Sequence, residues 1–145
     1  MLKIIHIKEN SKYFNSLIHL ELLLWPDNNF EDLFEESKKS NNTFYFGGII
    51  KEKLIGFIQI SIRYEYVNGS STSPLGYIEG IYVLNEYQRC GYGRKLIEFA
   101  CSFIKEKGYS EIASDVLIDN IESQEFHQKV GFSETERTIY YIRKL

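Results

Sequence analysis

The sequence contains few of the residues that commonly stabilise a small domain by cross-linking or by metal binding. Its 145 residues include 2 Cys, 2 Pro, 1 Trp and 3 scattered His. The two cysteines, Cys90 and Cys101, are too few for a disulfide framework and lack the spacing of metal ligands. We therefore expect a reducing, intracellular environment and no metal site.

Long apolar runs and a surplus of positive charge are also missing. The longest apolar run, residues 20–25, is interrupted by Glu21 and falls far short of the ~20 residues that a membrane span requires. The start of the chain resembles a strand rather than a signal peptide. Lys and Arg total 17 against 20 Asp and Glu, a net charge of −3, which argues against a basic surface for nucleic acid. These observations predict a cytoplasmic protein that binds neither membrane nor nucleic acid.

The chain has the length and composition of one folded domain. Apolar residues make up 43% and charged residues 26% of the sequence, which is the balance of a globular protein. A chain of 145 residues buries enough surface to form a core of its own. We expect residues 1–145 to form a single domain, with 11 Tyr and 10 Phe supplying the core and the walls of a polar-ligand site.

Apolar spacing predicts strands and helices along the whole chain. One helix should lie between the cap at Asn10 and Ser11 and the break at Pro26. Residues 76–115 read as strand, glycine turn, helix and strand, an order typical of a right-handed crossover between parallel strands. The predicted strands are residues 2–8, 43–51, 54–66, 76–84, 111–115, 133–136 and 139–143, the other predicted helices are residues 30–37, 93–107 and 120–130, and residues 38–42 form a polar loop.

A glycine turn, Q-R-C-G-Y-G at residues 88–93, is the most specific local signal. It follows a strand and opens a helix, whose first backbone N–H groups and dipole form an anion site. Arg89 and Arg94 add positive charge there. The turn lacks the Gly-Lys-Ser/Thr of a nucleoside-triphosphate loop, and Leu96 replaces the third glycine of a dinucleotide-binding turn. A plain connection between strand and helix is the alternative to phosphate binding.

Two segments resemble motifs of the GCN5-related N-acetyltransferase (GNAT) superfamily, and the order of elements agrees over essentially the whole chain. The segments are Q-x-x-G-x-G at residues 88–93 and F-H-Q-K-V-G-F at residues 126–132. The resemblance implies an α/β (α+β) fold with a mixed, mostly antiparallel sheet, a splayed central pair of parallel strands and about four flanking helices. It also implies an enzyme that uses acetyl-CoA as co-substrate.

The same resemblance assigns contacts with acetyl-CoA. Pantetheine would pair with the backbone of Ile81, Tyr82 and Val83, and the start of the following helix would add Asn120. The pyrophosphate would lie on the turn formed by Gln88, Arg89, Cys90, Gly91, Tyr92, Gly93 and Arg94. His127 stands where the superfamily usually has the tyrosine that protonates the departing thiolate, so it is a candidate general acid. A packed or solvated histidine without a catalytic role is the alternative.

Further motifs resemble the aminoglycoside 6′-N-acetyltransferases, from about residue 22 to the C-terminus. They are R-Y-E-Y-V-N-G at residues 63–69, I-E-G-I-Y-V-L at residues 78–84 and G-F-S-E-T-E-R at residues 131–137. This resemblance implies acetylation of the 6′-amine of aminoglycoside antibiotics, hence resistance. It also implies a homodimer, in which the Tyr- and Ile-rich residues 139–142 would join the partner's sheet. The family's substrate positions correspond to Trp25, Tyr66, Glu79, Asp115 and Glu136.

The residues themselves agree with a polycationic substrate. Glu79 interrupts an apolar strand, and a buried carboxylate needs a partner. Strand alternation places Glu79 on the same face as Ile81, while Asp115 ends the neighbouring parallel strand. Carboxylates that converge at one place repel one another and favour a cation between them. Structural roles remain as alternatives: a turn cap for Asp115, and packing or a solvated face for the other positions.

The predicted reaction is direct acetyl transfer in a ternary complex. A protonated amine cannot attack a thioester, so Glu79 is the candidate to hold the amine and pass its proton to water. Backbone N–H near Val83 would stabilise the oxyanion. Two alternatives remain, an acetyltransferase for another cationic amine such as a polyamine or a protein N-terminus, and a non-catalytic protein that binds acetyl-CoA or the drug.

Overall fold

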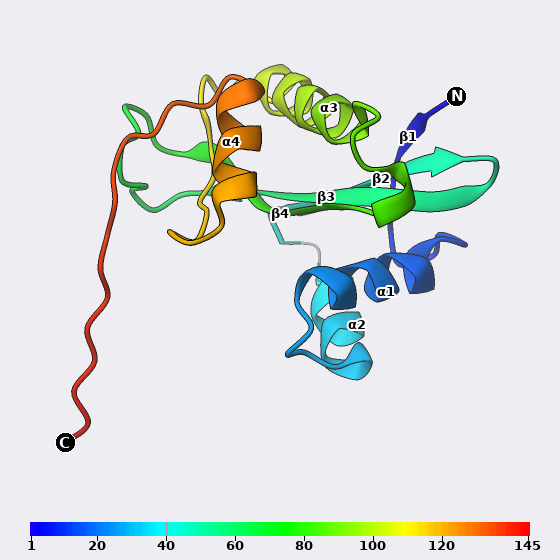
Figure 1. Ribbon diagram of the computed structural model, residues 1–145, viewed down its shortest axis with the longest axis horizontal. Coiled ribbons are helices and arrows are strands. Elements are labelled where there is room, and N and C mark those ends of the chain that lie inside the picture. The colour runs from blue at the N-terminus through cyan, green and yellow to red at the C-terminus, as the bar shows by residue number, and fades with distance from the viewer. Residues whose placement is uncertain (40) are drawn as a thin grey trace.

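The computed structural model describes residues 1–39 and 41–145 and contains a five-stranded sheet (Figure 1). The strand order across the sheet is β1 (Lys3–His6), β2 (Thr43–Ile50), β3 (Lys53–Arg63), β4 (Leu75–Val83) and β5 (Ile112–Ala113). The first three pairs are antiparallel, and β4 and β5 are parallel. The predicted mixed sheet with one parallel pair is confirmed.

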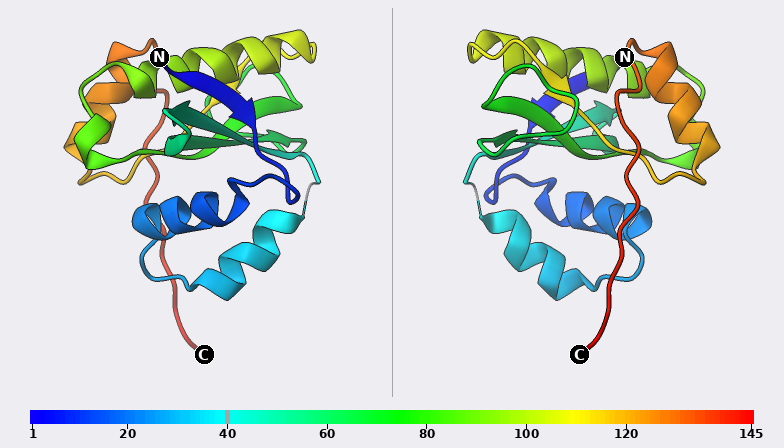
Figure 2. Two further views of the ribbon diagram at one scale, coloured as in Figure 1. Left: turned by 90° about the vertical axis from the view of Figure 1, so that its right-hand side faces the viewer. Right: turned by 90° about the vertical axis from the view of Figure 1, so that its left-hand side faces the viewer.

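Helices cover both faces of this sheet (Figure 2). On one face lie α1 (Phe14–Leu24) and α2 (Phe30–Lys38). On the other face lies α3 (Tyr92–Glu106), with α4 (Ile121–Lys129) beside it, and a short 3₁₀ turn (Asn85–Tyr87) joins β4 to the glycine turn. All four predicted helices are present in the described residues, with small differences at their ends.

Each face of the sheet has its own apolar core, because successive strand side chains point to opposite faces. The core under α3 includes Ile58, Ile60, Leu96, Ala100 and Ile104. The core under α1 includes Leu17, Ile18, Leu54 and Phe57. The central strands are therefore covered on both faces and form a rigid support for the polar side chains that they carry. None of the helices within residues 1–39 and 41–145 is long and apolar enough to span a bilayer.

The structure differs from the sequence prediction at the C-terminus. Residues 133–136 and 139–143 are predicted strands, but residues 133–145, all of them described, form no helix or strand and project away from the sheet (Figure 1). A β-prone segment becomes a strand only when a neighbouring strand supplies hydrogen bonds. The predicted strands 54–66 and 111–115 are shorter than expected, and the predicted loop 38–42 includes Ser40, which lies outside the described residues.

Candidate active site

A β-bulge in β4 places the candidate catalytic carboxylate. Gln59 of β3 pairs with Gly80 of β4, and Ile60 pairs with Ile78, so Glu79 is an extra residue between two paired positions. A bulge of this kind interrupts the regular alternation of side chains along a strand. Such bulges commonly redirect a side chain next to a functional site.

Because of the bulge, the Glu79 side chain points to a different face of the sheet from the predicted one. Its side chain lies with Ser61 and Arg63 on the face of the sheet that carries α1, whereas Ile81 packs into the core under α3. The next residue, Gly80, also faces α1, since a Cβ built there would come within 2.5 Å of a ring carbon of Trp25. The prediction that Glu79 and Ile81 share a face is therefore wrong, because regular alternation does not hold across a bulge.

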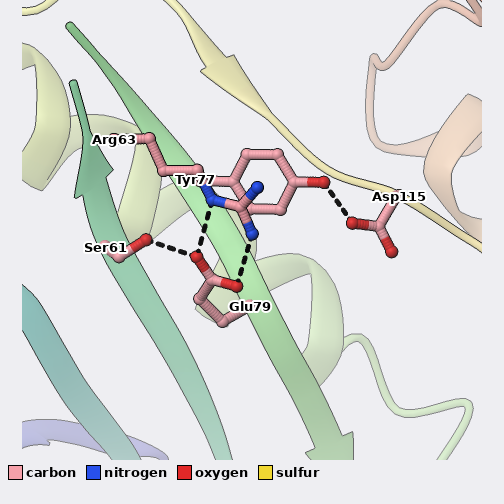
Figure 3. Close-up of polar contacts among 5 residues, drawn as sticks. All are labelled: Ser61, Arg63, Tyr77, Glu79 and Asp115. Carbon is pink, nitrogen blue, oxygen red and sulfur yellow. Dashed lines mark hydrogen bonds and ion pairs between the residues drawn. The ribbon is translucent and has the colours of Figure 1, made fainter. Parts of the chain in front are cut away.

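Glu79 is bound by two neighbours on β3 (Figure 3). The Ser61 hydroxyl donates to Glu79 Oε2 at 2.5 Å, and Arg63 Nε donates to the same oxygen at 3.0 Å. Arg63 Nη2 donates to Glu79 Oε1 at 2.7 Å. The Glu79 side chain is 26% exposed and that of Arg63 is 42% exposed. Ser61 and Arg63 thus supply the hydrogen bonds and the opposite charge that a partly buried carboxylate needs.

Tyr77 extends this cluster to the second candidate carboxylate. The Arg63 guanidinium carbon lies 3.4 Å from the centroid of the Tyr77 ring, a cation–π contact. The Tyr77 hydroxyl donates a hydrogen bond to Asp115, which follows β5 (Figure 3). Burial, followed by this hydrogen bond, raises the pKa of Tyr77, so its hydroxyl stays protonated at neutral pH. Glu79 and Asp115 thus lie in one cluster with Arg63 between them. Because two carboxylates face one guanidinium, the cluster carries one net negative charge.

Trp25, another predicted substrate residue, borders Gly80, the residue next to Glu79. It follows α1 and packs edge-on against Phe57 with ring centroids 6.3 Å apart. This position allows Trp25 to act both as a core residue and as a wall beside Glu79.

Tyr66 and Glu136 lie on segments that contact each other, and in the described residues neither side chain forms a hydrogen bond or ion pair with the Glu79 cluster. Tyr66 is 69% exposed on the loop after β3, and Glu136 is exposed on the C-terminal segment. A side chain at Gly69 of the loop would collide with Thr135, next to Glu136. Glu111 fastens the same loop by accepting a 2.7 Å hydrogen bond from the backbone N–H of Thr72.

The edge of β4 is open along the residues that are predicted to pair with pantetheine. β5 pairs with β4 at Gly76 and Tyr77, and in the described part of the chain this ladder continues no further. β4 itself runs on to Val83 while remaining paired with β3 on its other side. Ile81, Tyr82 and Val83 therefore carry backbone groups at an edge from which β5 has diverged, and an extended ligand can pair with that edge.

The glycine turn has the backbone geometry of an anion site. Gly91 is the N-cap of α3 with φ of +83°, a conformation that favours glycine, and Arg89 also has a positive φ of +61°. Gly93 leaves room for Phe126 of α4, which would lie 3.2 Å from an added Cβ. The first turn of α3 carries no acidic residue, so its N–H groups and positive dipole end are suited to a phosphate. The binding of a pyrophosphate by this turn stays a prediction, with which its backbone geometry is compatible.

Several side chains of the turn have structural partners. Gln88 Nε2 donates to the Val83 carbonyl at 2.7 Å and so ties the turn to the end of β4. Arg94 Nη2 donates to the Lys129 carbonyl at 2.9 Å and thereby joins α3 to α4. The Asn120 side chain caps α4 by accepting a hydrogen bond from the Ser123 N–H at 3.1 Å. The contacts of Gln88 and Arg94 hold the turn in place, and that of Asn120 caps the neighbouring helix. Cys90 and Tyr92 also lie within the turn.

His127 is partly buried and hydrogen-bonded through both ring nitrogens. Its Nδ1 lies 2.8 Å from the Ser123 carbonyl, which can only accept, so Nδ1 carries the proton. In a neutral ring Nε2 is then the acceptor for the Ser114 hydroxyl at 2.7 Å. Phe132 packs edge-on against the imidazole, with ring centroids 5.3 Å apart. The half-buried ring is thus held beside the segment that leads from β5 to Asp115.

The sequence prediction missed the hydrogen-bond partners of the candidate residues. Ser61 and Arg63 bind Glu79, Tyr77 binds Asp115, and Ser114 binds His127. One signal was available for two of them: Ser61 and Arg63 are two residues apart on a strand and so share a face. The pairing of that face with Glu79 depends on strand register and on the bulge, which spacing within one strand does not define.

Curated relatives resemble the chain over most of its length. It is 40% identical over 129 residues to an aminoglycoside N(6′)-acetyltransferase type 1 of Acinetobacter genomosp. 13, which covers 87% of this chain and 88% of the relative. It is 35% identical over 130 residues to the protein of the same name from Serratia marcescens, covering 87% and 89% of the two chains.

Solved structures resemble the fold closely. An aminoglycoside antibiotic 6′-N-acetyltransferase from Acinetobacter baumannii superposes with a TM-score of 0.89 at 34% identity, covering 100% of this chain and 99% of the other. The acetyltransferase AAC(6′)-Iy, in complex with the bisubstrate analogue CoA-S-monomethyl-acetylneamine, gives a TM-score of 0.91 at 32% identity with the same coverage. Residues 10–132 match the acetyltransferase (GNAT) family, and together with these similarities the match shows that the chain belongs to this family.

Proposed function

We propose that the protein transfers the acetyl group of acetyl-CoA to the 6′-amine of aminoglycoside antibiotics and so gives resistance to them. The observation that carries this proposal is the acidic cluster of Glu79 and Asp115 beside the open edge of β4. A polycationic acceptor is attracted to this cluster while the thioester lies along the neighbouring edge. Relatives and structural neighbours that are named for this activity support the assignment.

In the proposed mechanism, Glu79 holds the acceptor amine and receives its proton, directly or through water. The amine nitrogen then bonds to the thioester carbonyl carbon, and the resulting oxyanion is stabilised by backbone N–H near Val83. In the collapse of this tetrahedral intermediate the nitrogen gives its second proton to solvent, the C–S bond breaks and CoA leaves as the thiolate. The imidazolium form of His127, which carries a proton on Nε2 beside the Ser114 hydroxyl, is the candidate donor of the proton that the thiolate takes up.

The remaining candidate residues bind the rest of the acceptor. Asp115 and Glu136 offer carboxylates to its other ammonium groups, and Trp25 and Tyr66 offer flat amphipathic walls. On the acetyl-CoA side, Ile81 to Val83 pair with pantetheine and the turn at residues 88–94 holds the pyrophosphate.

We further infer a homodimer that works in the cytoplasm. Ile139 and Ile142 of the C-terminal segment are 75% and 92% exposed, and pairing with a partner's sheet would cover this apolar segment. Cys90 and Cys101 are both free thiols, which agrees with a reducing compartment.

The decisive assay is release of free CoA with kanamycin or tobramycin, compared with an aminoglycoside that lacks the 6′-amine. We expect release with the first two drugs alone. Glu79→Gln should lower turnover by about 10²- to 10⁴-fold, the usual contribution of a general base. Glu98→Gln, which changes an exposed carboxylate on α3, is the matched control.

The assay also separates the alternatives. Turnover of a polyamine or a peptide N-terminus without turnover of any aminoglycoside would replace the proposed acceptor. Binding of acetyl-CoA and drug without release of CoA would identify a non-catalytic binding protein. Near-normal activity of Glu79→Gln would remove the proposed role of Glu79 while leaving the reaction itself in place.

A further inference from the structure

We propose that Arg63 is a positioning residue for the acetyl transfer: it fixes the Glu79 carboxylate so that one acceptor position remains for the amine. The inference rests on the proposed function, because the role of Glu79 belongs to that proposal. Arg63 lies within a motif of the sequence, R-Y-E-Y-V-N-G, but the proposed mechanism gives it no step.

The geometry of the pair defines the orientation of the carboxylate. Arg63 uses two different nitrogens for the two oxygens of Glu79, at 3.0 Å and 2.7 Å. Such a two-point contact fixes the plane of a carboxylate, which a single ammonium cannot do. Arg63 and Ser61 come from β3, whereas Glu79 comes from the bulge of β4, so the contact also connects the bulge to its neighbouring strand.

Counting acceptor positions shows what remains for a ligand. An ionised carboxylate offers about four lone-pair positions. In the described structure, Ser61 and Arg63 Nε take up Oε2, and Arg63 Nη2 takes one position on Oε1. A further donor is therefore directed to Oε1 from one side. This restriction suits a carboxylate that must accept one proton from one nitrogen, rather than a general anchor for cations.

Arg63 is itself held in place. Its guanidinium carbon lies 3.4 Å from the centre of the Tyr77 ring, and the hydroxyl of that ring is bound to Asp115. The side chain is nevertheless 42% exposed. Ion pairs with this much exposure contribute little to folding stability. The arrangement therefore serves the orientation of Glu79 more than the stability of the fold.

The experiment compares Arg63→Met and Arg63→Lys with the wild-type enzyme, measuring kcat and KM for kanamycin at saturating acetyl-CoA. Arg63→Met should lower kcat by about 10²-fold, the size of effect that a misplacement of about 1 Å produces. The KM for acetyl-CoA, measured separately at saturating kanamycin, should remain within about twofold, and the melting temperature should fall by less than about 4 °C. Arg63→Lys keeps the charge without the two-point contact, so it should recover only part of the lost kcat.

A double variant tests whether Arg63 acts through Glu79. In a Glu79→Gln background, Arg63→Met should change kcat by less than about twofold, because the group that it positions is already disabled. Lys39→Met, which breaks an exposed ion pair with Glu36, is the control and should leave kcat unchanged.

The outcomes distinguish this inference from the proposed function. If the wild-type protein releases no CoA with kanamycin or any other aminoglycoside, the proposed function fails and the inference fails with it. If the wild type is active and Arg63→Met keeps its kcat, the inference alone is overturned. The inference would also be overturned if the kcat losses of the two single variants multiplied in the double variant. A lower melting temperature of Arg63→Met without a lower kcat would overturn it as well.

Discussion

Glu21 is a buried carboxyl that the proposed chemistry does not use. It lies on α1 with only 2% of its surface exposed, and the Ser37 hydroxyl on α2 lies 2.9 Å and 3.1 Å from its two oxygens. Burial raises its pKa from 4.5 to about 7, while the hydrogen bond from Ser37 acts in the opposite direction. The folded state therefore favours the neutral acid over the carboxylate across part of the physiological pH range.

This difference makes the free energy of unfolding depend on pH in a definite direction. Below pH 4.5 Glu21 is protonated in both the folded and the unfolded chain, so it adds no pH dependence. Between pH 4.5 and about 7 the unfolded chain ionises first, and stability falls as pH rises. Above this range the loss is complete. It amounts to about 3 kcal/mol, at about 1.4 kcal/mol for each tenfold change in proton affinity.

Glu21→Gln should remove this dependence, because an amide stays neutral. We expect the unfolding free energy of the variant, relative to wild type, to rise by about 2 kcal/mol between pH 5 and pH 8. Urea unfolding at several pH values, followed by circular dichroism, measures the difference, and shared titrating groups cancel in the comparison. Glu98→Gln on the exposed side of α3 is the control. Parallel pH profiles for wild type and Glu21→Gln would refute the reasoning.

Three further predictions concern the site and its surroundings. Gly80→Ala should lower the unfolding free energy by about 1–3 kcal/mol in thermal or urea unfolding, because the new methyl group would overlap the Trp25 ring. Asp115→Ala should raise the KM for kanamycin at least tenfold and leave the dissociation constant of acetyl-CoA unchanged in calorimetry; an equal loss of both would contradict its assignment to the acceptor side. A chain shortened by residues 139–145 should run as a monomer in light scattering while the full chain runs as a dimer, and a monomeric full chain would refute the proposed dimer.

The helix and turn that bind the pyrophosphate in the proposed function were the most predictable part of the molecule. Their signal is local: two closely spaced glycines at the start of an amphipathic helix can be recognised without knowing any distant contact, and Gly91 does adopt the positive φ that favours glycine. The same holds for the parallel connection from β4 through α3 to β5, because a strand–helix–strand order permits few topologies.

The surroundings of Glu79 were less predictable. Which strand residues face it depends on the register between β3 and β4, and the bulge shifts that register at Glu79 itself. Its ion pair with Arg63 therefore could not be derived from spacing along either strand. The prediction of strands in the C-terminal segment is wrong for another reason. The segment has β propensity, but a strand also needs a neighbouring strand, which the described single chain does not provide.

The bulge at Glu79 has a consequence for how this enzyme can diversify. One inserted residue turns the Glu79 carboxylate toward α1, while Ile78, Ile81 and Val83 of β4 keep their packing under α3. Substitutions on the α1 side, at Trp25 or around Arg63, can therefore reshape the acceptor pocket with little disturbance of the strand edge proposed for acetyl-CoA. In the proposed function, one strand thus carries two binding surfaces, and substitutions can alter the acceptor side without altering the side for acetyl-CoA.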